Sequence, residues 1–572
     1  MAASAVPERA QPRLVLLGDT GTMLPGASLP IATPRARWAA LVAVGAGLIG
    51  AAAFPRLGIW PLAMLSVAGL SWAVDERRCR TGAWLGLLYG VAFFGGLLHW
   101  TGTYVGAVPW LLLTAAEAVF MAGLGAILPL VQRLPGAPVW IGTAWVLQEA
   151  LRDRLPFGGF PWGRLAFSQA DSPLRWFAAL GGIPLLSFAV AVGGGGLALA
   201  GRQLRPLAQR WRGSPVPQSR PSPGRRLIGA LIVTATVLGA GALLHWPLAP
   251  APDHDGRTMA IAIVQGSVPD RGLGFEDRAR QVLDNHVRQT LLLAADVDAG
   301  TAPKPALVIW PENASDVDPY RDAAAAAEIS RAANAVDTPI LIGAILQGPG
   351  VNHRRNAGIL WSPTTGPGAI YTKRHPVPFA EYMPWRTLAD AVSSAAKLVT
   401  EDMVAGHSNG LLRGGPAPIG DVICFEVAYD DLVRSSITAG AQLLVVQTNN
   451  ASFGHTAETY QQLAMSRLRA VETGRAVLQA STTGISAVIG PDGTVRQRSG
   501  ALFTPDIISA TVALRTIQTP ADRLGPRPEY LLAALAVLAC GASLLRSRRR
   551  TAQRPGTGSE PSAAAPDEMA TR

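Results

Sequence analysis

Long apolar stretches separated by short polar loops fill the first 250 residues of the chain. A helix needs about 20 predominantly apolar residues to cross the roughly 30 Å hydrocarbon core of a bilayer. Eight stretches approach that length and predict membrane-spanning helices: 38–54, 57–75, 82–100, 108–131, 137–151, 173–200, 227–249 and 529–545. The stretch 137–151 is the weakest candidate, because it is short and carries Glu149.

A different pattern, of short β-rich runs between polar and helical segments, occupies residues 257–515. These runs predict strands at 260–264, 306–310, 340–345, 359–361, 422–425, 443–447 and 476–480. Helices are expected over 323–335 and 457–473, and the Pro-Asp-Gly turn within 487–495 predicts a hairpin. The alternation of strands and helices favours a layered α/β sandwich.

The two patterns divide the chain into five parts. We expect a disordered cytoplasmic tail over 1–36, a membrane domain with about seven helices over 37–250, a globular domain over 251–520, a C-terminal membrane helix over 528–546 and a second disordered cytoplasmic tail over 547–572. Four consecutive glycines at 193–196 interrupt the sixth apolar stretch. No Lys-Ser/Thr pair follows them, so close helix packing explains them better than a phosphate-binding loop.

Charge supports a membrane location and suggests an orientation. Charged residues make up 16% of the chain, whereas a soluble protein carries about 25%. The net charge of +11 is concentrated in 202–226, with seven arginines and no acidic residue, and in 546–550, with four arginines. Basic loops stay in the cytoplasm, so we expect 250–528 outside, together with 101–107 and 152–172. No motif that reads nucleic-acid grooves accompanies the charge, and nucleic-acid binding is not expected.

The exception to this charge rule is the loop 152–172. It is predicted to lie outside, yet it contains Arg152, Arg154 and Arg164. The basic loop at 75–80 and the basic segment at 202–226 fit the predicted orientation.

A thiol, an amine and two carboxylates stand at or near the ends of predicted strands in the polar domain. Cys424 ends a short buried strand, and Glu312 follows another. Lys373 lies in a proline-rich extended loop, with Glu381 eight residues beyond. A cysteine becomes a useful nucleophile when a base or a cation favours its thiolate. Taken singly, the same residues also fit a buried inert cysteine, a solvated loop carboxylate or a surface lysine.

The chain has three cysteines, Cys79, Cys424 and Cys540, and no C-x-x-C motif or His/Cys cluster. We therefore expect no metal and no cofactor. Cys424 is alone in the polar domain and has no disulfide partner there. An unpaired thiol outside the cytoplasm fits a reactive role.

The order and spacing of these residues resemble the Glu-Lys-Cys pattern of the nitrilase superfamily. The pattern is carried by Trp-Pro-Glu312, Tyr-Thr-Lys373 and Ile-Cys424-Phe-Glu. The segments 449–454, 461–467 and 469–475 are similar to the same superfamily. Upstream, 54–63 and the Glu149 to Gln169 region, with its Phe-Pro-Trp-Gly motif, resemble one branch, the apolipoprotein N-acyltransferases. The resemblance covers about 38–545.

The resemblance implies a polytopic α-helical membrane domain of about eight spans that carries an external nitrilase-like αββα sandwich, in the bacterial plasma (inner) membrane. It implies transfer of an acyl chain from a membrane phospholipid, through a Cys424 thioester, to the α-amino group of the N-terminal diacylglyceryl-cysteine of an apolipoprotein. Glu312 is then the general base. Lys373 and the backbone N–H of Phe425 stabilise the oxyanion. No cofactor is implied, and we assume a monomer.

Further residues receive roles from the same resemblance. Glu381 is expected to orient Lys373 or Glu312, and Glu426 to support the nucleophile loop. Candidate substrate contacts are Glu149, Phe160, Trp162, Asn356, Asn450 and Ser452. The two aromatic residues fit equally a simple anchoring role at the membrane interface.

The chain departs from the family pattern at two positions. Phe425 stands where the family commonly has tyrosine, and Ser452 where it commonly has tryptophan. These changes bear on acyl-chain or substrate preference more than on the chemistry. Two other functions remain open: a membrane-tethered nitrilase-type amidase with water as acceptor, and a non-enzymatic transporter or scaffold. The spans carry few ionisable groups, chiefly Glu117 and Glu149, which disfavours a transporter.

Overall fold

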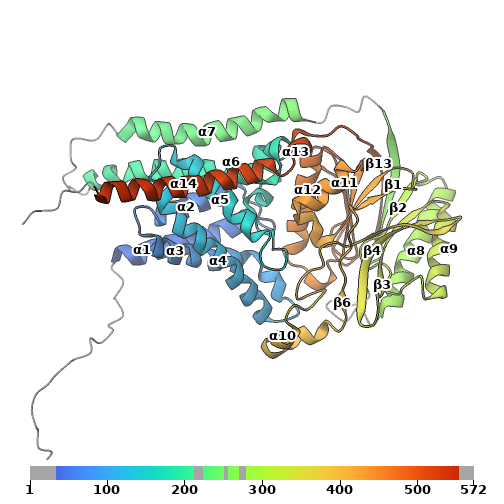
Figure 1. Cartoon of the computed structure of the whole chain (residues 1–572). Helices are drawn as coiled ribbons and strands as arrows, with labels where there is room; N and C mark the ends of the chain where they lie inside the picture. The colour runs from blue at the N-terminus through green and yellow to red at the C-terminus, as the bar shows by residue number, and fades with distance from the viewer. Residues whose placement is uncertain (1–33, 212–222, 250–255, 269–277, 553–572) are drawn as a thin grey trace, which may run out of the picture.

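The computed structural model describes residues 34–211, 223–249, 256–268 and 278–552, and it places a helical bundle beside a two-sheet domain (Figure 1). Helices occupy all eight ranges predicted to span the membrane: α1 Pro34–Ala52, α2 Pro61–Ala73, α3 Cys79–Leu97, α4 Ala107–Val131, α5 Ala137–Arg152, α6 Trp176–Trp211, α7 Pro223–Leu248 and α14 Arg527–Ala552. Residues 1–33 and 553–572, most of the two predicted tails, lie outside the described residues.

Four helical segments in the described part of the chain are long and apolar enough to cross a bilayer: Ala107–Val131, Pro173–Gln203, Leu227–Leu248 and Arg527–Arg549. Large apolar side chains on these helices are exposed, including Leu231, Trp246 and Leu538. Contiguous apolar surface of this kind faces lipid in a membrane protein. The helices α1 and α2 are shorter, so the count of eight spans stays a prediction.

Glycines allow the bundle helices to approach closely. A Cβ added at Gly82 of α3 would lie 2.1 Å from the Gly125 carbonyl oxygen of α4. In α6, a Cβ at Gly194 would lie 2.6 Å from the Met64 carbonyl oxygen of α2. Only glycine permits such backbone contact. The expectation that 193–196 serves helix packing is confirmed at Gly194.

The polar domain contains two sheets. The first has the order β13-β1-β2-β3-β4-β5, with β6 beside β4, and the second has the order β12-β11-β10-β9-β8-β7. The strands of the first sheet are β1 Thr258–Gln265, β2 Leu307–Ile309, β3 Ile340–Gln347, β4 His353–Ser362, β5 Gly366–Thr372, β6 Asp402–Met403 and β13 Asp506–Ala513. Those of the second are β7 Leu411–Leu412, β8 Ile419–Ile423, β9 Leu443–Thr448, β10 Val477–Ser481, β11 Ala487–Ile489 and β12 Val495–Arg498.

Helices cover both outer faces of the sheets, which gives the predicted αββα order. On the side away from the bundle lie α8 Ala279–Asp298 and α9 Ala323–Val336 (Figure 1). On the side facing the bundle lie α11 Asp430–Thr438 and α12 Glu458–Thr473 (Figure 1). Leu468 of α12 belongs to the same apolar core as Leu97 and Ile183 of the bundle. The inner helix layer of the sandwich is therefore buried against the membrane domain.

One strand prediction was too long. The predicted strand 422–425 ends at Ile423, and Cys424 begins the 3-10 turn η6, Cys424–Ala428. Cys424 has a φ of +54°, which is incompatible with a continued strand. The turn moves the cysteine off the sheet edge while its neighbours stay buried.

The arginines of 152–172 are paired with carboxylates at the junction of the two parts. Arg152 lies 3.1 Å from Glu117, and Arg154 lies 2.6 Å from Glu529. Arg164 lies 2.8 Å from Asp430. An arginine that is paired with a carboxylate carries less free positive charge than an exposed one. The pairing therefore explains how three arginines can lie at the end of the bundle that contacts the sandwich.

Candidate active site

Cys424 directly follows the carboxyl end of β8, in the second sheet, and begins the turn η6. Its left-handed backbone costs on the order of 1–3 kcal/mol for a residue with a Cβ. Two possible donors lie within hydrogen-bond distance of the sulfur, Thr448 Oγ1 at 3.4 Å and Gln462 Nε2 at 3.8 Å. Enclosure by the protein raises the pKa of the thiol well above its usual range, and Glu312 adds to this, while Lys373 opposes it. Enclosure therefore disfavours the thiolate of Cys424 unless neighbouring groups stabilise it.

Glu312 follows β2 and is almost fully buried. Its Oε1 accepts from Lys373 Nζ at 3.1 Å and from Asn356 Nδ2 at 2.7 Å. Its Oε2 accepts from the Asn449 backbone N–H at 2.8 Å. Three donors fix both oxygens of the carboxylate, which suits a base that must hold one orientation.

Lys373 directly follows β5 and places its ammonium between two carboxylates. Nζ donates to Glu381 Oε1 at 2.8 Å as well as to Glu312. Burial alone would lower the pKa of Lys373, but Glu312 and Glu381 more than offset it, and the pKa lies well above its ordinary value. Lys373 therefore keeps its positive charge beside Cys424.

Asn356 of β4 bridges the two carboxylates. Its Nδ2 donates to Glu312 Oε1 at 2.7 Å and to Glu381 Oε1 at 3.1 Å. The amide nitrogen of Asn356 is thus committed within the cluster. Its Oδ1 has no hydrogen-bond partner among the described residues, and the expected substrate contact of Asn356 stays a prediction. Glu381 is tied down at its other oxygen by the Val377 N–H at 2.6 Å.

Glu426 is fully buried and joins the nucleophile turn to the Lys373 loop. It accepts the backbone N–H of Ile423 at 2.9 Å, of Arg374 at 2.6 Å and of His375 at 3.1 Å. The Tyr371 hydroxyl donates to both of its oxygens at 2.9 Å. Burial raises the pKa of Glu426, against the effect of these donors. These contacts tie the turn η6 to the Lys373 loop.

Phe425 turns towards the membrane domain and meets the loop after α5. Its ring stacks on Phe160, with centroids 5.4 Å apart, and on Trp162, with centroids 6.0 Å apart. Trp162 also contacts Trp100, at 5.2 Å. The residue after Cys424 therefore packs into an aromatic cluster that the membrane domain supplies.

Two polar side chains hold this aromatic loop in place. Arg152 donates to the carbonyl oxygens of Phe160 at 2.5 Å and Trp162 at 2.7 Å. Gln461 of α12 accepts both indole N–H groups, from Trp162 at 2.7 Å and from Trp100 at 3.2 Å. Gln461 thus fixes α12 against the aromatic loop of the membrane domain.

Comparison with known proteins follows this division of the chain. A model of the apolipoprotein N-acyltransferase N-terminal domain matches residues 46–196, and a carbon-nitrogen hydrolase model matches residues 261–521. The apolipoprotein N-acyltransferase of Mycolicibacterium smegmatis is 41% identical over 523 residues, which covers 89% of this chain and 85% of that protein.

The chain belongs to the apolipoprotein N-acyltransferase family. The Azotobacter vinelandii apolipoprotein N-acyltransferase is 29% identical over 556 residues, covering 91% of this chain and 97% of that protein. Among solved structures, an amidase of the nitrilase superfamily from Nesterenkonia AN1 is 21% identical, covers 46% of this chain and 92% of its own, and gives a TM-score of 0.34. The nitrilase-like fold of the sandwich rests on the carbon-nitrogen hydrolase match and on the two-sheet topology.

The structure brings together some residues expected in this acyltransferase site and separates others. Glu312, Lys373 and Glu381 form one hydrogen-bonded cluster. Glu149 lies elsewhere: its Oε1 accepts the Leu165 N–H at 2.9 Å, which indicates a structural role.

Asn450 and Ser452 follow β9. Asn450 is buried, and it donates to Glu458 at 2.8 Å and to Gln462 at 2.9 Å. These contacts tie Asn450 to α12, and its expected substrate contact stays a prediction. Ser452 lies in the short turn η7, Ala451–Phe453, with a partly exposed side chain.

Several residues of the site were missed from the sequence. Thr448 and Gln462 reach the sulfur, and Tyr371 binds Glu426. Glu458 is buried, and burial raises its pKa to about 8. Gln462 and Glu458 fall in the predicted helix 457–473, and Gln462 also lies in the segment 461–467 that resembles the superfamily. Neither signal shows which side chains reach the sulfur.

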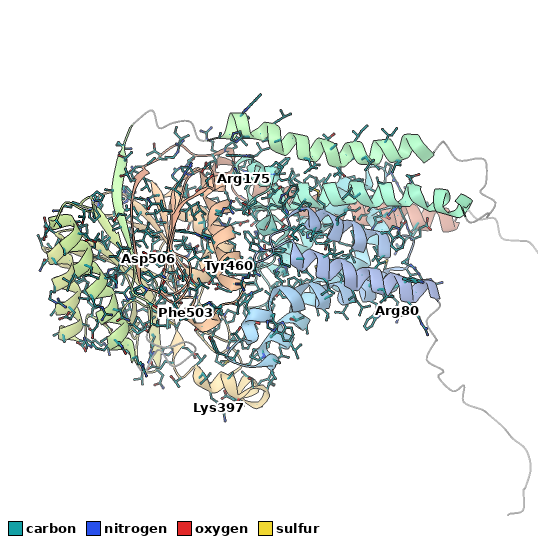
Figure 2. All side chains as sticks on the ribbon, turned by 180° about the vertical axis from the view of Figure 1, so that it is seen from behind. Arg80, Arg175, Lys397, Tyr460, Phe503 and Asp506 are labelled. Atoms are coloured by element: carbon teal, nitrogen blue, oxygen red, sulfur yellow. The ribbon has the colours of Figure 1, made fainter. Side chains whose placement is uncertain are left out.

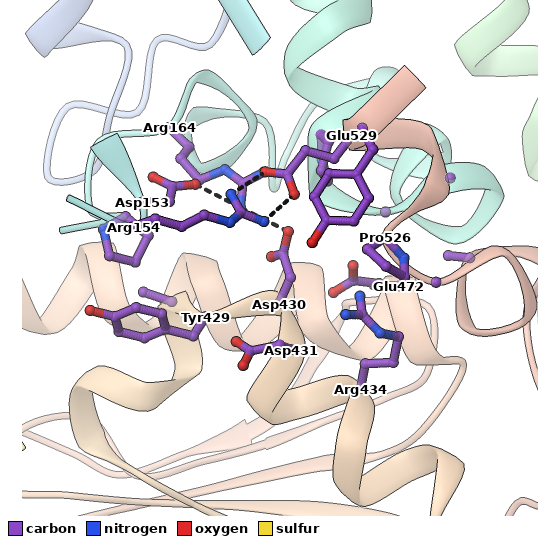
Figure 3. Close-up of a pocket in the computed structure, with 18 of the residues that line it drawn as sticks. Asp153, Arg154, Arg164, Tyr429, Asp430, Asp431, Arg434, Glu472, Pro526 and Glu529 are labelled. Atoms are coloured by element: carbon purple, nitrogen blue, oxygen red, sulfur yellow. Dashed lines mark hydrogen bonds and ion pairs between the residues drawn. The ribbon is translucent and has the colours of Figure 1, made fainter. Parts of the chain in front are cut away.

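A charged cavity of about 320 Å³ lies beside this site, between α11, the loop after α5 and the start of α14 (Figure 3). Arg154 and Glu529 pair across it, and Arg164 pairs with Asp430 (Figure 3). None of Glu312, Lys373 and Cys424 lines it. Its charges join the two parts of the molecule.

Proposed function

We propose that this protein N-acylates lipoproteins in the bacterial plasma membrane. It transfers a fatty acyl chain from a membrane phospholipid to the α-amino group of an N-terminal diacylglyceryl-cysteine, through a thioester on Cys424. The family of the chain supports this activity. The observation that carries the mechanism is the packing of Phe425, next to the nucleophile, on Phe160 and Trp162 of the membrane domain.

The first half-reaction loads the enzyme. Glu312 takes the thiol proton, and the Cys424 thiolate attacks an ester carbonyl carbon of the phospholipid. Lys373 and the Phe425 N–H stabilise the oxyanion, a contribution of roughly 3–4 kcal/mol per well-placed donor. The C–O bond then breaks, and Glu312 returns its proton to the leaving lysophospholipid alkoxide. A thioester stays on Cys424.

The second half-reaction forms an amide. The free α-amino group attacks the thioester carbonyl carbon, and Glu312 takes a proton from the attacking nitrogen. The C–S bond breaks, and the departing Cys424 thiolate recovers that proton from Glu312. The two half-reactions give ping-pong kinetics, and no net proton is gained or lost by the enzyme.

Apolar side chains at the membrane edge of the sandwich support a lipid substrate. The short helix α10, Arg386–Val392, lies beside the bundle (Figure 1). Around it Phe379, Trp385 and Leu388 are exposed, and Phe157 of the membrane loop packs on the first two. Exposed aromatic groups at this level suit contact with the bilayer interface.

The proposal includes the topology. Eight spans, a catalytic domain over 251–520 on the extracytoplasmic side and cytoplasmic tails over 1–36 and 547–572 bring the site to the outer leaflet, and the enzyme acts as a monomer. Basic loops at the opposite end of the bundle support this orientation.

The alternatives are less well supported. A nitrilase-type amidase shares the first half-reaction, but the relatives over most of the chain are N-acyltransferases. A transporter needs ionisable groups along a path. Glu117 is instead paired with Arg152, and Glu149 with the Leu165 N–H.

The decisive experiment follows the acyl chain. The purified full-length enzyme is incubated with a phospholipid that carries an isotopically labelled acyl chain, and Cys424 is analysed by mass spectrometry. A diacylglyceryl peptide with a free N-terminus is then added. We expect a labelled acyl group on Cys424 that moves to the peptide nitrogen.

The controls separate the candidate functions. A peptide with an acetylated N-terminus should leave the acyl-enzyme intact, and Cys540→Ala should behave like the unmodified enzyme. Peptide acylation by Cys424→Ala at the unmodified rate would refute the mechanism. Discharge of the adduct to water alone, with the free peptide present, would favour the amidase.

A further inference from the structure

Two polar side chains reach the Cys424 sulfur from elements that carry none of Glu312, Lys373 and Glu381. Thr448 ends β9, and its Oγ1 lies 3.4 Å from Sγ. Gln462 lies in α12, and its Nε2 lies 3.8 Å from Sγ. Both side chains are fully buried. These distances suit hydrogen bonds to sulfur, which is a larger acceptor than oxygen.

The network behind Gln462 fixes which end of its amide faces the thiol. Gln462 Oε1 accepts from Thr448 Oγ1 at 2.9 Å and from Asn450 Nδ2 at 2.9 Å. Asn450 is itself oriented, because Ser481 donates to its Oδ1 at 2.5 Å and its Nδ2 donates to Glu458 at 2.8 Å. Turning the Gln462 amide over would set its NH₂ against the Asn450 NH₂. Nε2, a donor, is therefore held towards Cys424.

Thr448 has one hydroxyl proton and two acceptors within reach. Oγ1 can donate to Gln462 Oε1 or to Cys424 Sγ, but not to both at once. While Cys424 is a thiol, the stronger oxygen acceptor on Gln462 holds that proton. When Cys424 becomes a thiolate, rotation about the C–O bond of Thr448 turns the proton to the sulfur without movement of any heavy atom.

The surroundings of the sulfur make such donors useful. The ionisable groups that influence the Cys424 pKa are Glu312 and Glu458, which raise it, and Lys373, which lowers it. Lys373 pairs with both Glu312 and Glu381, so these carboxylates offset part of the stabilisation that its charge gives to the thiolate. Neutral donors stabilise the thiolate without drawing either carboxylate away from its partners.

We propose that Thr448 and Gln462 form a donor pair that contacts the Cys424 sulfur and stabilises its thiolate. Gln462 supplies a fixed donor, and Thr448 supplies one that turns to the sulfur on deprotonation. The proposal rests on the proposed role of Cys424 as the nucleophile. The thiolate at the end of β8 is then stabilised by side chains of two other elements, β9 and α12.

The test measures the thiol itself. In the full-length protein with Cys79→Ala and Cys540→Ala, Cys424 is the only thiol, and its alkylation rate by iodoacetamide is followed as a function of pH. A hydrogen bond to a charged group is worth roughly tenfold or more in an equilibrium. We expect Thr448→Val and Gln462→Leu each to slow alkylation at pH 7 by about tenfold and to move the pH profile upwards by about one unit.

Rescue separates donation from packing. Thr448→Ser keeps the hydroxyl and should keep the profile of the parent protein, whereas Thr448→Val has nearly the same volume without a donor. Thr438, whose hydroxyl donates to the Arg434 carbonyl on α11, provides the matched control: Thr438→Val should change nothing.

An unchanged rate and pH profile in Thr448→Val would overturn the proposal. Equal slowing in Thr448→Val and Thr448→Ser would also overturn it, because packing would then explain the loss. Alkylation reports on the thiol whether or not acyl transfer occurs. Failure of the parent protein to form an acyl-enzyme would therefore refute the proposed function and leave the donor pair to be judged by its own result.

Discussion

At the scale of single residues, the site depends on a buried ammonium held between two carboxylates. Lys373 is 2% exposed and contacts Glu312 at 3.1 Å and Glu381 at 2.8 Å. A buried ion cluster of this kind is weakly stabilising as a whole, but removal of one partner leaves uncompensated charge. The same lysine opposes the rise in the Cys424 pKa. Stability and reactivity therefore depend on one charge.

The first prediction removes that charge. Lys373→Met keeps an unbranched side chain, one atom shorter, and leaves Glu312 and Glu381 facing each other without a cation, so the free energy of unfolding should fall by about 3–5 kcal/mol. Loss of both thiolate and oxyanion stabilisation should slow acylation of Cys424 by at least roughly 10³-fold. Thermal unfolding and the rate of acyl-enzyme formation measure the two effects.

The control for this prediction is Lys397, an exposed lysine near α10 (Figure 2). Lys397→Met should leave both measurements unchanged. Acyl-enzyme formation at the unmodified rate in Lys373→Met would contradict the role given to Lys373.

A second prediction concerns a histidine outside the site. His286 of α8 is fully buried, and its Nδ1 lies 2.8 Å from the Val282 carbonyl oxygen. Nε2 has no hydrogen-bond partner among the described residues. Burial lowers the pKa of His286 to about 4 from an ordinary 6.5. Between these values the unfolded chain binds a proton that the folded protein does not, so stability falls as the pH drops from 6.5 to 4.

This histidine should account for roughly 2 kcal/mol of stability lost between pH 7 and pH 5. His286→Gln should remove that part of the pH dependence, and His353→Gln, at an exposed position, should not. Thermal midpoints of the full-length protein at the two pH values provide the measurement. Equal pH sensitivity in the parent and His286→Gln would contradict the prediction.

The residues that could be predicted from the sequence are those that form motifs. Glu312, Lys373 and Cys424 lie at strand ends with recognisable neighbours. Gln462 lies within the segment 461–467 that resembles the superfamily, but the contacts of Thr448 and Gln462 with the sulfur arise only when β9 and α12 meet β8 in space. The assignment of a site from sequence therefore captures the reacting groups before the groups that position them.

At the scale of elements, the loop between α5 and η2 (Leu165–Ser168) connects the bundle to the nucleophile. The contacts between this part of the membrane domain and α12 converge on Gln461. Its side-chain Oε1 accepts the indole N–H groups of Trp100 and Trp162. Both indoles are buried, so neither can turn to water if the acceptor is lost. One amide side chain thereby anchors α12 to two separate parts of the membrane domain.

The third prediction removes this acceptor. Gln461→Leu leaves two buried N–H donors unsatisfied, at a cost of about 1–3 kcal/mol each. The free energy of unfolding should fall by roughly 2 kcal/mol or more, and the loosened Trp162 should shift the tryptophan fluorescence of the full-length protein. Gln497→Leu, at an exposed position of β12, is the control and should leave the free energy of unfolding unchanged. Equal unfolding free energies for Gln461→Leu and the parent would contradict the anchoring role.

Element prediction succeeded where the apolar pattern coincides with backbone hydrogen bonding. The predicted strand 340–345 lies within β3, and the predicted helix 457–473 matches α12. The strand 422–425 was extended too far, because the apolar run continues beyond the strand into a turn. The turn begins with the positive φ of Cys424, and a hydrophobic pattern does not reveal a backbone angle. The two-residue strand β7 is too short to show a period of two.

At the scale of the whole molecule, charge is divided between the two ends of the bundle. Arg80, at the start of α3, lies at the end away from the sandwich (Figure 2). At the other end, Arg152, Arg154 and Arg164 are neutralised by carboxylates. Free basic residues resist transfer across a membrane, whereas paired ones in a folded junction contribute less. The asymmetry favours a cytoplasmic location for the end that carries Arg80.

The fourth prediction tests this orientation with single cysteines in a background that carries Cys79→Ala, Cys424→Ala and Cys540→Ala. Tyr320→Cys lies on the sandwich at a position 52% exposed, and Pro135→Cys lies in the exposed turn between α4 and α5 at the far end of the bundle. Spheroplasts that express each variant are treated with a membrane-impermeant maleimide before or after lysis.

If the catalytic domain faces outwards, Tyr320→Cys is labelled on intact spheroplasts and Pro135→Cys only after lysis. The reverse pattern would place the sandwich in the cytoplasm. It would also separate Cys424 from the outer leaflet and contradict the route proposed for both lipid substrates. Because four apolar helices alone do not fix the number of crossings, opposite labelling of these two positions would also require an odd number of crossings between residues 135 and 320. The three predicted helices between them, α5, α6 and α7, meet that requirement.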